Sequence, residues 1–495
     1  MSVSTATTAC EMLALLRDGK ASAVELAKEA LDRIEQHQPT INAYTHVDRD
    51  GALARAQAVD AARANGESLG PLAGVPVAVK DVLCTKGLPT TCSSEMLRGF
   101  VPPYDATVVE KLHAAGAVVV GKTNMDEFAM GASTETSAMG ITRNPWDHER
   151  TPGGSSGGAA ATVACGDVPL SIGTDTGGSI RQPAAFCGVT GMKPTYGRVS
   201  RYGLVAFASS LDQAGPIANS VEDIALMMDV ISGHEPRDST SLDVPVDDYS
   251  GAVQSSDLRG IRIGVLRNAL AQEGVDDSVR QAVTAAESTF QDLGAEIIDI
   301  ELPHSPYWVP TYYVIAPCEA SSNLSRYDGA HYGHRQRNDA ADSPLEMMYR
   351  LSRKEGFGSE VKRRIMVGTY ALSAGYYDAY YNQALKVRRL IKGDFDAAFS
   401  QADLLLGPVT PSPAFPLGQN ADDPVAMYLC DLFTVGANLA GVPAISLPGG
   451  QDASGLPVGI QLQAPALMET RLLFAGHAFQ TATEHHRQRP AAVIA

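Results

Sequence analysis

The sequence predicts an α/β fold with a large mixed, mainly parallel sheet and helices covering both of its faces. Apolar runs of strand length alternate with helical segments along the chain, and this order is typical of parallel strands joined by crossover helices. The composition, 44% hydrophobic and 19% charged, is that of an ordinary globular protein. We interpret residues 1–495 as a single domain, although this length also allows two or three smaller ones.

The N-terminal residues predict helices. Residues 8–11 (Thr-Ala-Cys-Glu) and 22–25 (Ser-Ala-Val-Glu) both match the capping-box pattern, in which the two polar side chains satisfy free amides at a helix start. Apolar residues then recur on one helical face at Ala27, Leu31 and Ile34. The pattern fits a helical arm, residues 1–65, packed on the body of the protein, and it fits a helix hairpin at the surface equally well.

Strands and helices alternate after this arm. We predict a buried strand at 75–79 and a second strand at 117–120. Between them, Asp105 caps a predicted helix that runs to Ala115 and ends at Gly116. Similar elements recur later in the chain. They are strand 261–266, helix 278–293, strands 295–300, 403–406, 444–447 and 458–462, and a closing helix at 468–481.

Two long segments depart from this alternation. Residues 234–256 are polar and rich in charge, so we predict an exposed connection between two halves of one sheet. Residues 303–395 contain most of the tyrosines and many arginines and lysines. We interpret them as a helical insertion, such as a lid or a cap that faces a partner.

Composition and charge argue against several function classes. The net charge of -17 disfavours extended binding of a nucleic-acid backbone, but a partner subunit could still contact nucleic acid. The seven cysteines are scattered and form no C-x-x-C pair, which predicts neither a disulfide framework nor a zinc site and fits a reducing cytoplasm. We find neither a signal-peptide pattern nor an apolar run near the ~20 residues that a membrane helix needs.

The chemistry is concentrated in glycine-serine loops. Residues 153–158 read Gly-Gly-Ser-Ser-Gly-Gly, and Gly-Gly-Ser follows at 177–179. Serine becomes a nucleophile once a base removes its proton, and lysine can be that base. A flexible linker is the main alternative, but apolar segments flank the loop closely. A phosphate-binding loop would need G-x-x-x-x-G-K-[ST], and a hydrolase elbow would need G-x-S-x-G; neither pattern matches well.

Two candidate bases precede these serines. Lys80 ends the apolar run of residues 74–80, where burial would disfavour its charged form and lower its pKa. A salt bridge from Lys80 to Asp81 or to another carboxylate is an equally open interpretation on these grounds. His148 lies seven residues before Ser155 and is the strongest histidine rival, although a loop histidine is more often structural.

Five motifs resemble the amidase signature family over nearly the whole chain, about residues 10–485. They are Gly-Val-Pro-Val-Ala-Val-Lys-Asp at 74–81, Thr-Pro-Gly-Gly-Ser-Ser-Gly-Gly at 151–158, Gly-Thr-Asp-Thr-Gly-Gly-Ser-Ile-Arg-Gln-Pro at 173–183, Gly-Val-Thr-Gly-Met-Lys-Pro at 188–194 and Ser-Ser-Leu-Asp-Gln-Ala-Gly-Pro at 209–216. The resemblance assigns residues 66–232 to the catalytic signature region.

The resemblance implies a catalytic triad. Ser179 would be the acyl-accepting nucleophile, Ser155 the bridging serine after a cis peptide bond, and Lys80 the terminal base and acid. Backbone amides of Thr176, Gly177, Gly178 and Ser179 would bind the developing oxyanion. Ser156 is interpreted as a support for the loop. Neither a metal nor a cofactor is expected in this chain.

Further stretches resemble one branch of that family, the glutaminase subunits of tRNA-dependent amidotransferases. They lie at residues 319–329, 356–365, 375–381 and 431–443. This implies glutamine as the substrate, with Asp431 binding its ammonium group, Arg364 its carboxylate and Tyr313 lining the pocket. Arg363 and Tyr312 remain alternatives to their neighbours.

The same resemblance implies partners. B and C subunits would complete a heterotrimer, tRNA would be held mainly by the B subunit, and ATP and magnesium would be used by the partner. Two other functions remain open. One is a stand-alone amidase acting on other amides, and the other is a catalytically silent scaffold, against which the intact Lys80, Ser155 and Ser179 argue.

Overall fold

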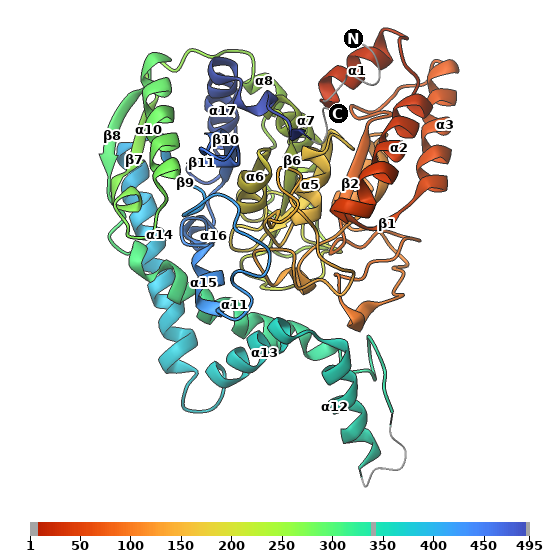
Figure 1. Ribbon diagram of the computed structural model, residues 1–495, viewed down its shortest axis with the longest axis vertical. Helices are drawn as coiled ribbons and strands as arrows, with labels where there is room; N and C mark the ends of the chain where they lie inside the picture. Colours follow the sequence, from red (N-terminus) through yellow and green to blue (C-terminus); the bar gives the residue numbers. More distant parts are fainter. Residues whose placement is uncertain (1–7, 338–342, 492–495) are drawn as a thin grey trace.

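A computed structural model describes residues 8–337 and 343–491 of the chain. Within these residues the strands form one eleven-stranded sheet in the order β1-β3-β2-β4-β6-β5-β10-β11-β9-β7-β8 (Figure 1). The strands are β1 Tyr44–Val47, β2 Pro76–Lys80, β3 Val118–Thr123, β4 Leu170–Asp175, β5 Thr190–Lys193, β6 Gln213–Ala218, β7 Arg262–Leu266, β8 Glu296–Ile300, β9 Leu404–Pro408, β10 Ala444–Gln451 and β11 Pro457–Gln463.

The α-helices fall before, between and after these strands, as an α/β fold requires. They are α1 Ala9–Arg17, α2 Ala23–Ile41, α3 Arg49–Ala64, α4 Thr107–Ala114, α5 Gly157–Ala164, α6 Arg181–Cys187, α7 Val221–Ile231, α8 Tyr249–Ala252, α9 Arg267–Leu270, α10 Asp277–Asp292, α11 Trp308–Asn323, α12 Pro344–Gly356, α13 Ser359–Ala371, α14 Gln383–Gln401, α15 Pro424–Leu429, α16 Val435–Ala440 and α17 Glu469–Thr483. The predicted α/β class with a large mixed sheet is confirmed.

Apolar side chains leave the sheet on both faces. In β2, Val77 and Val79 enter one large buried cluster, whereas Ala78 enters a second cluster on the other face. Helices α4, α7 and α17 contribute to the first cluster, and α2, α3 and α5 to the second. Alternate strand residues point to opposite faces, so the apolar run that precedes Lys80 in β2 needs cover on both sides.

The expectation of a mainly parallel sheet is wrong in its proportions. Four neighbouring pairs in the described sheet are parallel, namely β2-β3, β2-β4, β7-β8 and β7-β9, and the other six are antiparallel. The antiparallel pairs arise where β1, β5, β6 and the β10-β11 hairpin join the sheet. Strands β1, β4, β5 and β6 have no counterpart among the strands predicted above. Strand β6 reads Gln-Ala-Gly-Pro-Ile-Ala, and its glycine and proline make a strand hard to recognise from sequence.

The remaining predicted strands and long helices are present within a few residues of their expected bounds. Asp105 is an exception. Helix α4 begins at Thr107 after an Ala106 that makes no side-chain cap, and the Asp105 carboxylate accepts instead from the backbone N–H of Lys86 at 2.7 Å. The Asp105 carboxylate therefore stabilises the loop that contains Lys86 and not the start of the helix.

The N-terminal helices pack on the body of the protein. Both predicted capping boxes form, at Thr8 and Ser22, and such caps contribute about 1 kcal/mol each. The buried Asp223 of α7 accepts from the backbone amides of Ala9 and Cys10 at 2.8 and 3.0 Å. This tie joins α1 to a helix more than two hundred residues away and favours the packed arm over a surface hairpin.

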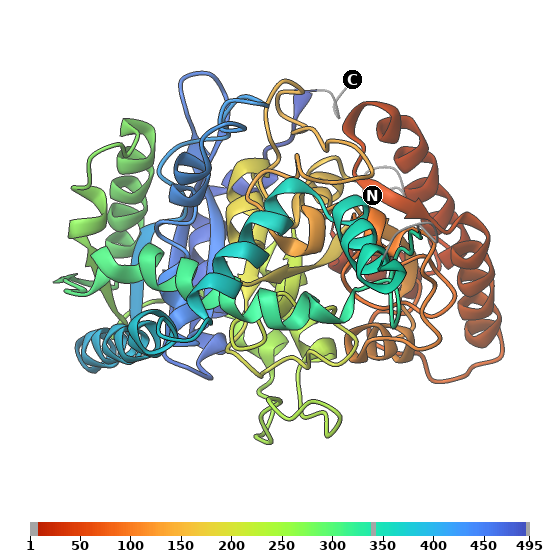
Figure 2. The same cartoon turned by 90° about the horizontal axis from the view of Figure 1, so that it is seen from below.

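Residues 234–256 connect α7 to β7 and thus join the two halves of the sheet. Their exposure is incomplete, because Tyr249 is fully buried and its backbone N–H donates to Asp229 at 2.8 Å. Residues 303–395 contain α11, α12, α13 and most of α14, which lie across the side of the molecule facing the viewer in Figure 2. Helix α12 projects away from the body (Figure 1). Residues 338–342 of this segment and the first seven of the N-terminal arm lie outside the described residues, and the division of the chain into these units stays a prediction.

All seven cysteines are free thiols. No helix in the described part of the chain is both long enough and apolar enough to cross a membrane.

Candidate active site

The sheet topology brings the predicted catalytic residues together. Strands β2 and β4 are adjacent and parallel, so their carboxyl ends meet at one edge of the sheet. Lys80 is the last residue of β2, and the loop after β4 carries Ser179. Residues 151–158 enter the same edge and lead into α5. Residues separated by almost a hundred positions in sequence therefore share one site.

The Lys80 amine is fully buried and surrounded by hydroxyl groups. Its Nζ lies 2.8 Å from each of three oxygens, Ser155 Oγ, Ser156 Oγ and Thr174 Oγ1. Desolvation lowers the pKa of Lys80 to about 7, although nearby buried carboxylates oppose the shift. The burial expected of this lysine is present, and much of the amine is neutral near physiological pH.

The alternative salt bridge from Lys80 to Asp81 does not form. Asp81 lies 3.3 Å from the buried Nζ of Lys122 and accepts from the hydroxyl of Thr91 at 2.5 Å. Successive residues at a strand end point to opposite faces of the sheet, which separates the two side chains. Lys80 thus has three neutral partners at 2.8 Å, and no carboxylate among the described residues lies within salt-bridge distance of it.

The bridging serine has the predicted backbone. The peptide bond between Gly154 and Ser155 is cis. The carbonyl of Ser155 accepts from the backbone N–H of Asp126 at 3.2 Å, and the N–H of Gly154 donates to the side chain of Gln182 at 2.8 Å. These contacts hold the loop on both sides of the cis bond.

A bridging role for Ser155 implies a hydrogen bond between the Ser155 and Ser179 hydroxyl groups, and the described structure does not contain this bond. The two loops are joined by the N–H of Ser156, which donates to the carbonyl of Ser179 at 3.2 Å. Within residues 8–337 and 343–491, the Ser179 hydroxyl makes no hydrogen bond, so it is not bonded to Ser155. Ser179 is only 8% exposed. Its hydroxyl is therefore unpaired inside a nearly closed site.

Three of the four predicted oxyanion donors are free in the described structure, those of Thr176, Gly177 and Ser179. The Gly178 amide is not, because it donates to Asp175 Oδ1 at 2.9 Å, so the oxyanion role predicted for this amide does not hold here. Gly178 instead shapes the turn. Its φ is +140°, and a Cβ at this position would lie 2.3 Å from Thr434 Oγ1. Glycine is the residue that tolerates both conditions.

A buried ion pair between Arg181 and Asp175 stabilises this turn. Arg181 bonds both carboxylate oxygens of Asp175 at 2.9 Å, and it also donates to the side chains of Asn438 and Gln461. Burial alone would raise the pKa of Asp175, but the Arg181 guanidinium outweighs it and lowers the pKa to about 2. The network fixes the nucleophile loop, and sequence reasoning did not assign these residues.

The predicted glutamine-binding residues also meet in space. The Tyr313 hydroxyl donates to Asp431 Oδ2 at 2.8 Å, and the Arg364 guanidinium lies 5.5 Å from the centre of the Tyr313 ring. Arg364 and Asp431 are both buried. Desolvation raises the pKa of Asp431 to about 7, although Tyr313 and Arg364 hold it down. A buried cation and a buried carboxyl group thus flank one tyrosine.

This pocket adjoins the nucleophile loop. The Thr434 hydroxyl donates to the carbonyl of Gly177 at 2.6 Å and to that of Asp431 at 3.1 Å, and so ties the two segments together. A Cβ on Gly177 would lie 2.7 Å from the Tyr312 hydroxyl oxygen. Tyr312 therefore lies against the nucleophile loop, whereas Tyr313 contacts Asp431, and both tyrosines border the site.

The two neighbouring arginines differ sharply. The Arg364 side chain is 5% exposed, and the Arg363 side chain is 45% exposed. Both pair with Glu360, and Tyr428 donates to the same carboxylate at 3.0 Å. Burial favours Arg364 as the residue that faces a substrate.

Two further carboxylates, Asp126 and Glu127, were missed by sequence reasoning. Asp126 accepts from the backbone amides of Ser133 and Thr134 at 3.3 and 2.9 Å. Glu127 accepts from the N–H of Gly358 at 2.8 Å, at the start of α13. Because α13 also carries Arg364, the Asp126-Glu127 pair joins the catalytic loops to the helix of the predicted substrate pocket. The run Asn-Met-Asp-Glu at 124–127 directly after β3 is the one signal that could have found them.

The rival base, His148, and the candidate metal ligands lie apart from the Lys80 hydrogen bonds described above. The hydrogen bond of His148 within the described residues is made by its backbone carbonyl, which accepts from Arg143 at 2.6 Å. Among the described residues, one group could hold a metal ion, and it adjoins the opposite end of β4: His37, Cys165 and Asp167. Ser156 and Thr174 contact Lys80 directly, so Ser156 does more than support the loop.

Known proteins resemble this chain over nearly its whole length. The amidase family profile matches residues 25–473. The chain is 69% identical over 486 residues to the A subunit of glutamyl-tRNA(Gln) amidotransferase from Rhodopirellula baltica, covering 97% of both chains. It is 58% identical over 469 residues to the protein of the same name from Carboxydothermus hydrogenoformans, covering 95% of this chain and 96% of the relative.

Solved structures agree as well. The crystal structure of the A subunit of glutamyl-tRNA(Gln) amidotransferase from Thermotoga maritima superimposes with a TM-score of 0.78 at 40% identity, covering 99% of this chain and 96% of the other. A 6-aminohexanoate cyclic dimer hydrolase superimposes with a TM-score of 0.86 at 26% identity over the full length of both chains. The fold, the buried lysine between serine loops and the near-complete family match converge on one assignment: the chain belongs to the amidase family.

Proposed function

We propose that this chain is the A subunit of a glutamyl-tRNA(Gln) amidotransferase and that it hydrolyses glutamine to supply ammonia. The observation that carries the proposal is a buried carboxyl group, Asp431, and a buried guanidinium, Arg364, on either side of Tyr313 and close to the nucleophile loop. A free amino acid has an ammonium and a carboxylate, and these two side chains complement them. A stand-alone amidase for apolar amides would need a lipophilic pocket at this position, where Asp431 and Arg364 lie instead.

The proposed reaction begins at Lys80. A neutral amine has two N–H donors and one lone pair. With the donors directed to Ser156 and Thr174, the lone pair faces Ser155 Oγ at 2.8 Å. Lys80 then accepts the Ser155 proton while Ser155 accepts that of Ser179, once the free Ser179 hydroxyl turns toward Ser155.

The Ser179 oxygen attacks the side-chain amide carbon of glutamine. In this proposal the free amides of Thr176 and Gly177 bind the developing oxyanion, and the loss of one such donor typically costs ~3 kcal/mol of barrier. The proton returns through Ser155 to the leaving nitrogen, the carbon-nitrogen bond breaks, and ammonia departs. Water then hydrolyses the glutamyl ester, which regenerates Ser179 and releases glutamate.

The ammonia would be used by partner subunits. In this proposal B and C subunits complete a heterotrimer, the B subunit holds the misacylated Glu-tRNA(Gln), and ATP and magnesium act there. Asp-tRNA(Asn) is a second possible acceptor, chosen by the partner. The net charge of -17 suits a protein that does not grip tRNA itself. The seven free thiols suit the cytoplasm.

The direct test is glutamine hydrolysis by the isolated chain and by the chain with its B and C subunits. We expect weak hydrolysis alone and a large increase with the partners, Glu-tRNA(Gln) and ATP. Full turnover of unrelated aryl or fatty amides without partners would instead identify a stand-alone amidase. No labelling of Ser179 by a serine-directed probe would favour a silent scaffold.

A further inference from the structure

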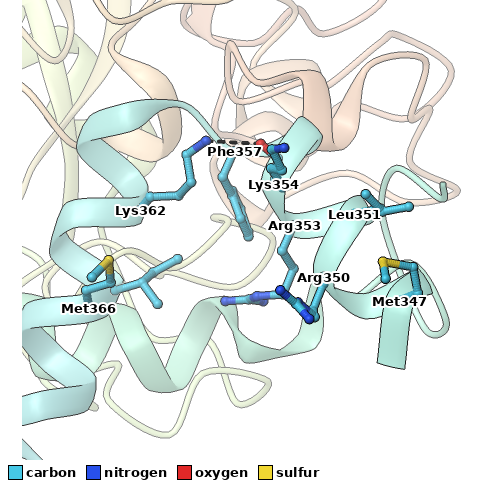
Figure 3. A pocket seen from close by; sticks show the side chains of 9 residues that line it. Met347, Arg350, Leu351, Arg353, Lys354, Phe357, Lys362 and Met366 are labelled. Atoms are coloured by element: carbon cyan, nitrogen blue, oxygen red, sulfur yellow. Dashed lines mark hydrogen bonds between the residues drawn. The ribbon is translucent and has the colours of Figure 1, made fainter. Parts of the chain in front are cut away.

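A cavity lies on the protein surface between α12, which projects from the body, and α13. Its volume is about 550 Å³. Figure 3 shows Arg350, Arg353 and Lys354 entering from α12 and Lys362 from α13. We call this cavity the α12–α13 groove. None of the predicted glutamine-binding residues lines this groove.

The groove is basic on a strongly acidic chain. Its four charged lining residues are all cations. Arg353 is already engaged, because it donates to the carbonyls of Leu324 and Tyr327 and stacks over Phe357 at 5.0 Å. Lys362 Nζ donates to the carbonyl of Lys354 at 3.0 Å, and Arg350 lies 3.7 Å from the exposed carboxylate of Glu346. Among residues 8–337 and 343–491, the four cations therefore have no carboxylate partner closer than this one, although the chain carries a net charge of -17.

The rest of the lining is apolar. It consists of Met347 and Leu351 from α12, Phe357 between the helices, and Ile365 and Met366 from α13. Met366 is 72% exposed. A phosphate backbone gains nothing from such a floor, whereas the apolar side chains of an amphipathic peptide bury surface there at roughly 25 cal/mol per Å². Basic rim and apolar floor together fit an acidic, amphipathic protein segment.

Helix α13 connects the groove to the substrate pocket. Its residues Lys362, Ile365 and Met366 line the groove. Its Arg364 lies 5.5 Å from the centre of the Tyr313 ring in the predicted substrate pocket. A segment bound in the groove would restrict α13 and with it the Arg364 guanidinium. A ligand that binds the ordered helix more tightly shifts the population toward it.

We propose that the α12–α13 groove docks an acidic, amphipathic segment of a partner subunit, and that this contact orders the glutamine pocket through α13. The inference rests on the proposed function for the identity of the partner. It assigns the stimulation of glutamine hydrolysis to a definite surface of this chain.

The test compares two double charge reversals, Arg350→Glu with Lys354→Glu in the groove and Arg17→Glu with Lys28→Glu on the distant N-terminal helices. Each variant, like the wild type, is titrated with the purified B and C subunits while glutamine hydrolysis is followed. For the groove variant we expect affinity for B and C to fall at least about tenfold and stimulation to fall with it. Unstimulated hydrolysis and the circular dichroism spectrum should not change, and the distant variant should match the wild type.

A second variant, Met366→Glu, tests the apolar floor without altering a cation, and it should also weaken assembly. Unchanged affinity for B and C in both groove variants would overturn the proposal, as would equal losses in the groove and distant variants. The proposal would also be overturned if the groove variants kept their affinity for B and C and lost affinity only for tRNA(Gln) tested alone. The groove would then be a nucleic-acid surface. A wild-type chain that neither hydrolyses glutamine nor binds B and C would refute the proposed function itself, and the groove proposal with it.

Discussion

Lys80 Nζ and Ser155 Oγ lie 2.8 Å apart at the carboxyl ends of the parallel strands β2 and β4, and the lysine is fully buried. Burial gives this contact its chemical meaning. In water a lysine amine is almost wholly protonated at neutral pH and cannot accept a serine proton. Here desolvation lowers the pKa of Lys80 to about 7, so a neutral acceptor and a donor hydroxyl coexist at hydrogen-bond distance.

The first prediction is a pH dependence of kcat set by Lys80. The neutral amine is the active form, so kcat should fall as the pH drops through about 7 and level off above it. Stability should follow in the same direction. The unfolded lysine has a pKa near 10.4, so between about 7 and 10.4 the unfolded chain binds more protons and stability rises with pH.

Lys80→Met provides the check on both effects. It should abolish hydrolysis and remove this contribution to the pH dependence of the unfolding free energy, measured by urea denaturation at about pH 7 and about pH 9. A kcat profile in Lys80→Met that resembles the wild type would exclude Lys80 as the base.

The second prediction separates the three serines. Ser179→Ala should abolish both hydrolysis and labelling by a serine-directed probe. Ser155→Ala should lower kcat by about 10²–10⁴-fold, the usual range for lost proton transfer. Ser156→Ala, which removes one acceptor of the Lys80 amine, should lower kcat about tenfold and leave KM unchanged, because the proton path survives. Steady-state kinetics distinguishes the three, and equal effects of Ser155→Ala and Ser156→Ala would contradict the assigned relay.

Much of this site could be predicted from the sequence because its chemistry lies in local motifs. The apolar run before Lys80 predicts burial, and the glycines around Ser155 and Ser179 predict tight loops. The structure adds the partners that come from distant segments. Thr434 contacts the Gly177 carbonyl across more than two hundred residues, and no local pattern indicates that contact.

For the fold, too, local sequence patterns could be predicted and contacts between distant segments could not. Apolar strands with clear boundaries, such as β7 and β9, were predicted within a few residues. Strand β6, with Gly215 and Pro216 in its centre, depends on its neighbours β4 and β5 rather than on its own propensity. The direction of pairing is likewise a tertiary property, so the antiparallel share of the sheet could not be read from alternation alone.

The third prediction distinguishes Arg364 from Arg363. Arg364→Lys should raise KM for glutamine by roughly 10–100-fold, because a buried guanidinium that binds a carboxylate is worth about 1.5–3 kcal/mol. Arg363→Lys, a matched change on the same helix at an exposed position, should change KM less than about twofold. A simple primary amide without an α-carboxylate serves as a second substrate. Its hydrolysis should respond equally to both variants, and a selective loss with Arg364→Lys there would point to damage of the site rather than lost recognition.

The last prediction concerns Glu127, which caps the helix that carries Arg364. Its carboxylate accepts from the Gly358 amide at 2.8 Å and from the Ser94 hydroxyl. Glu127→Gln keeps the shape but removes the charge, and a charged cap is worth about 1–2 kcal/mol. If α13 positions Arg364, the lost cap should raise KM for glutamine about tenfold and leave kcat nearly unchanged. Glu95→Gln, at an exposed neighbouring position, is the control.

The pH dependence makes this prediction specific to the carboxylate. Desolvation raises the pKa of Glu127 to about 7, so the wild-type side chain is largely ionised at about pH 8 and largely protonated at about pH 6. The ratio of the Glu127→Gln and wild-type KM values should therefore be large at the higher pH and approach one at the lower. A ratio that stays constant over this range would mean that Glu127 acts through packing alone, since the charge on the carboxylate would then contribute nothing to the position of α13.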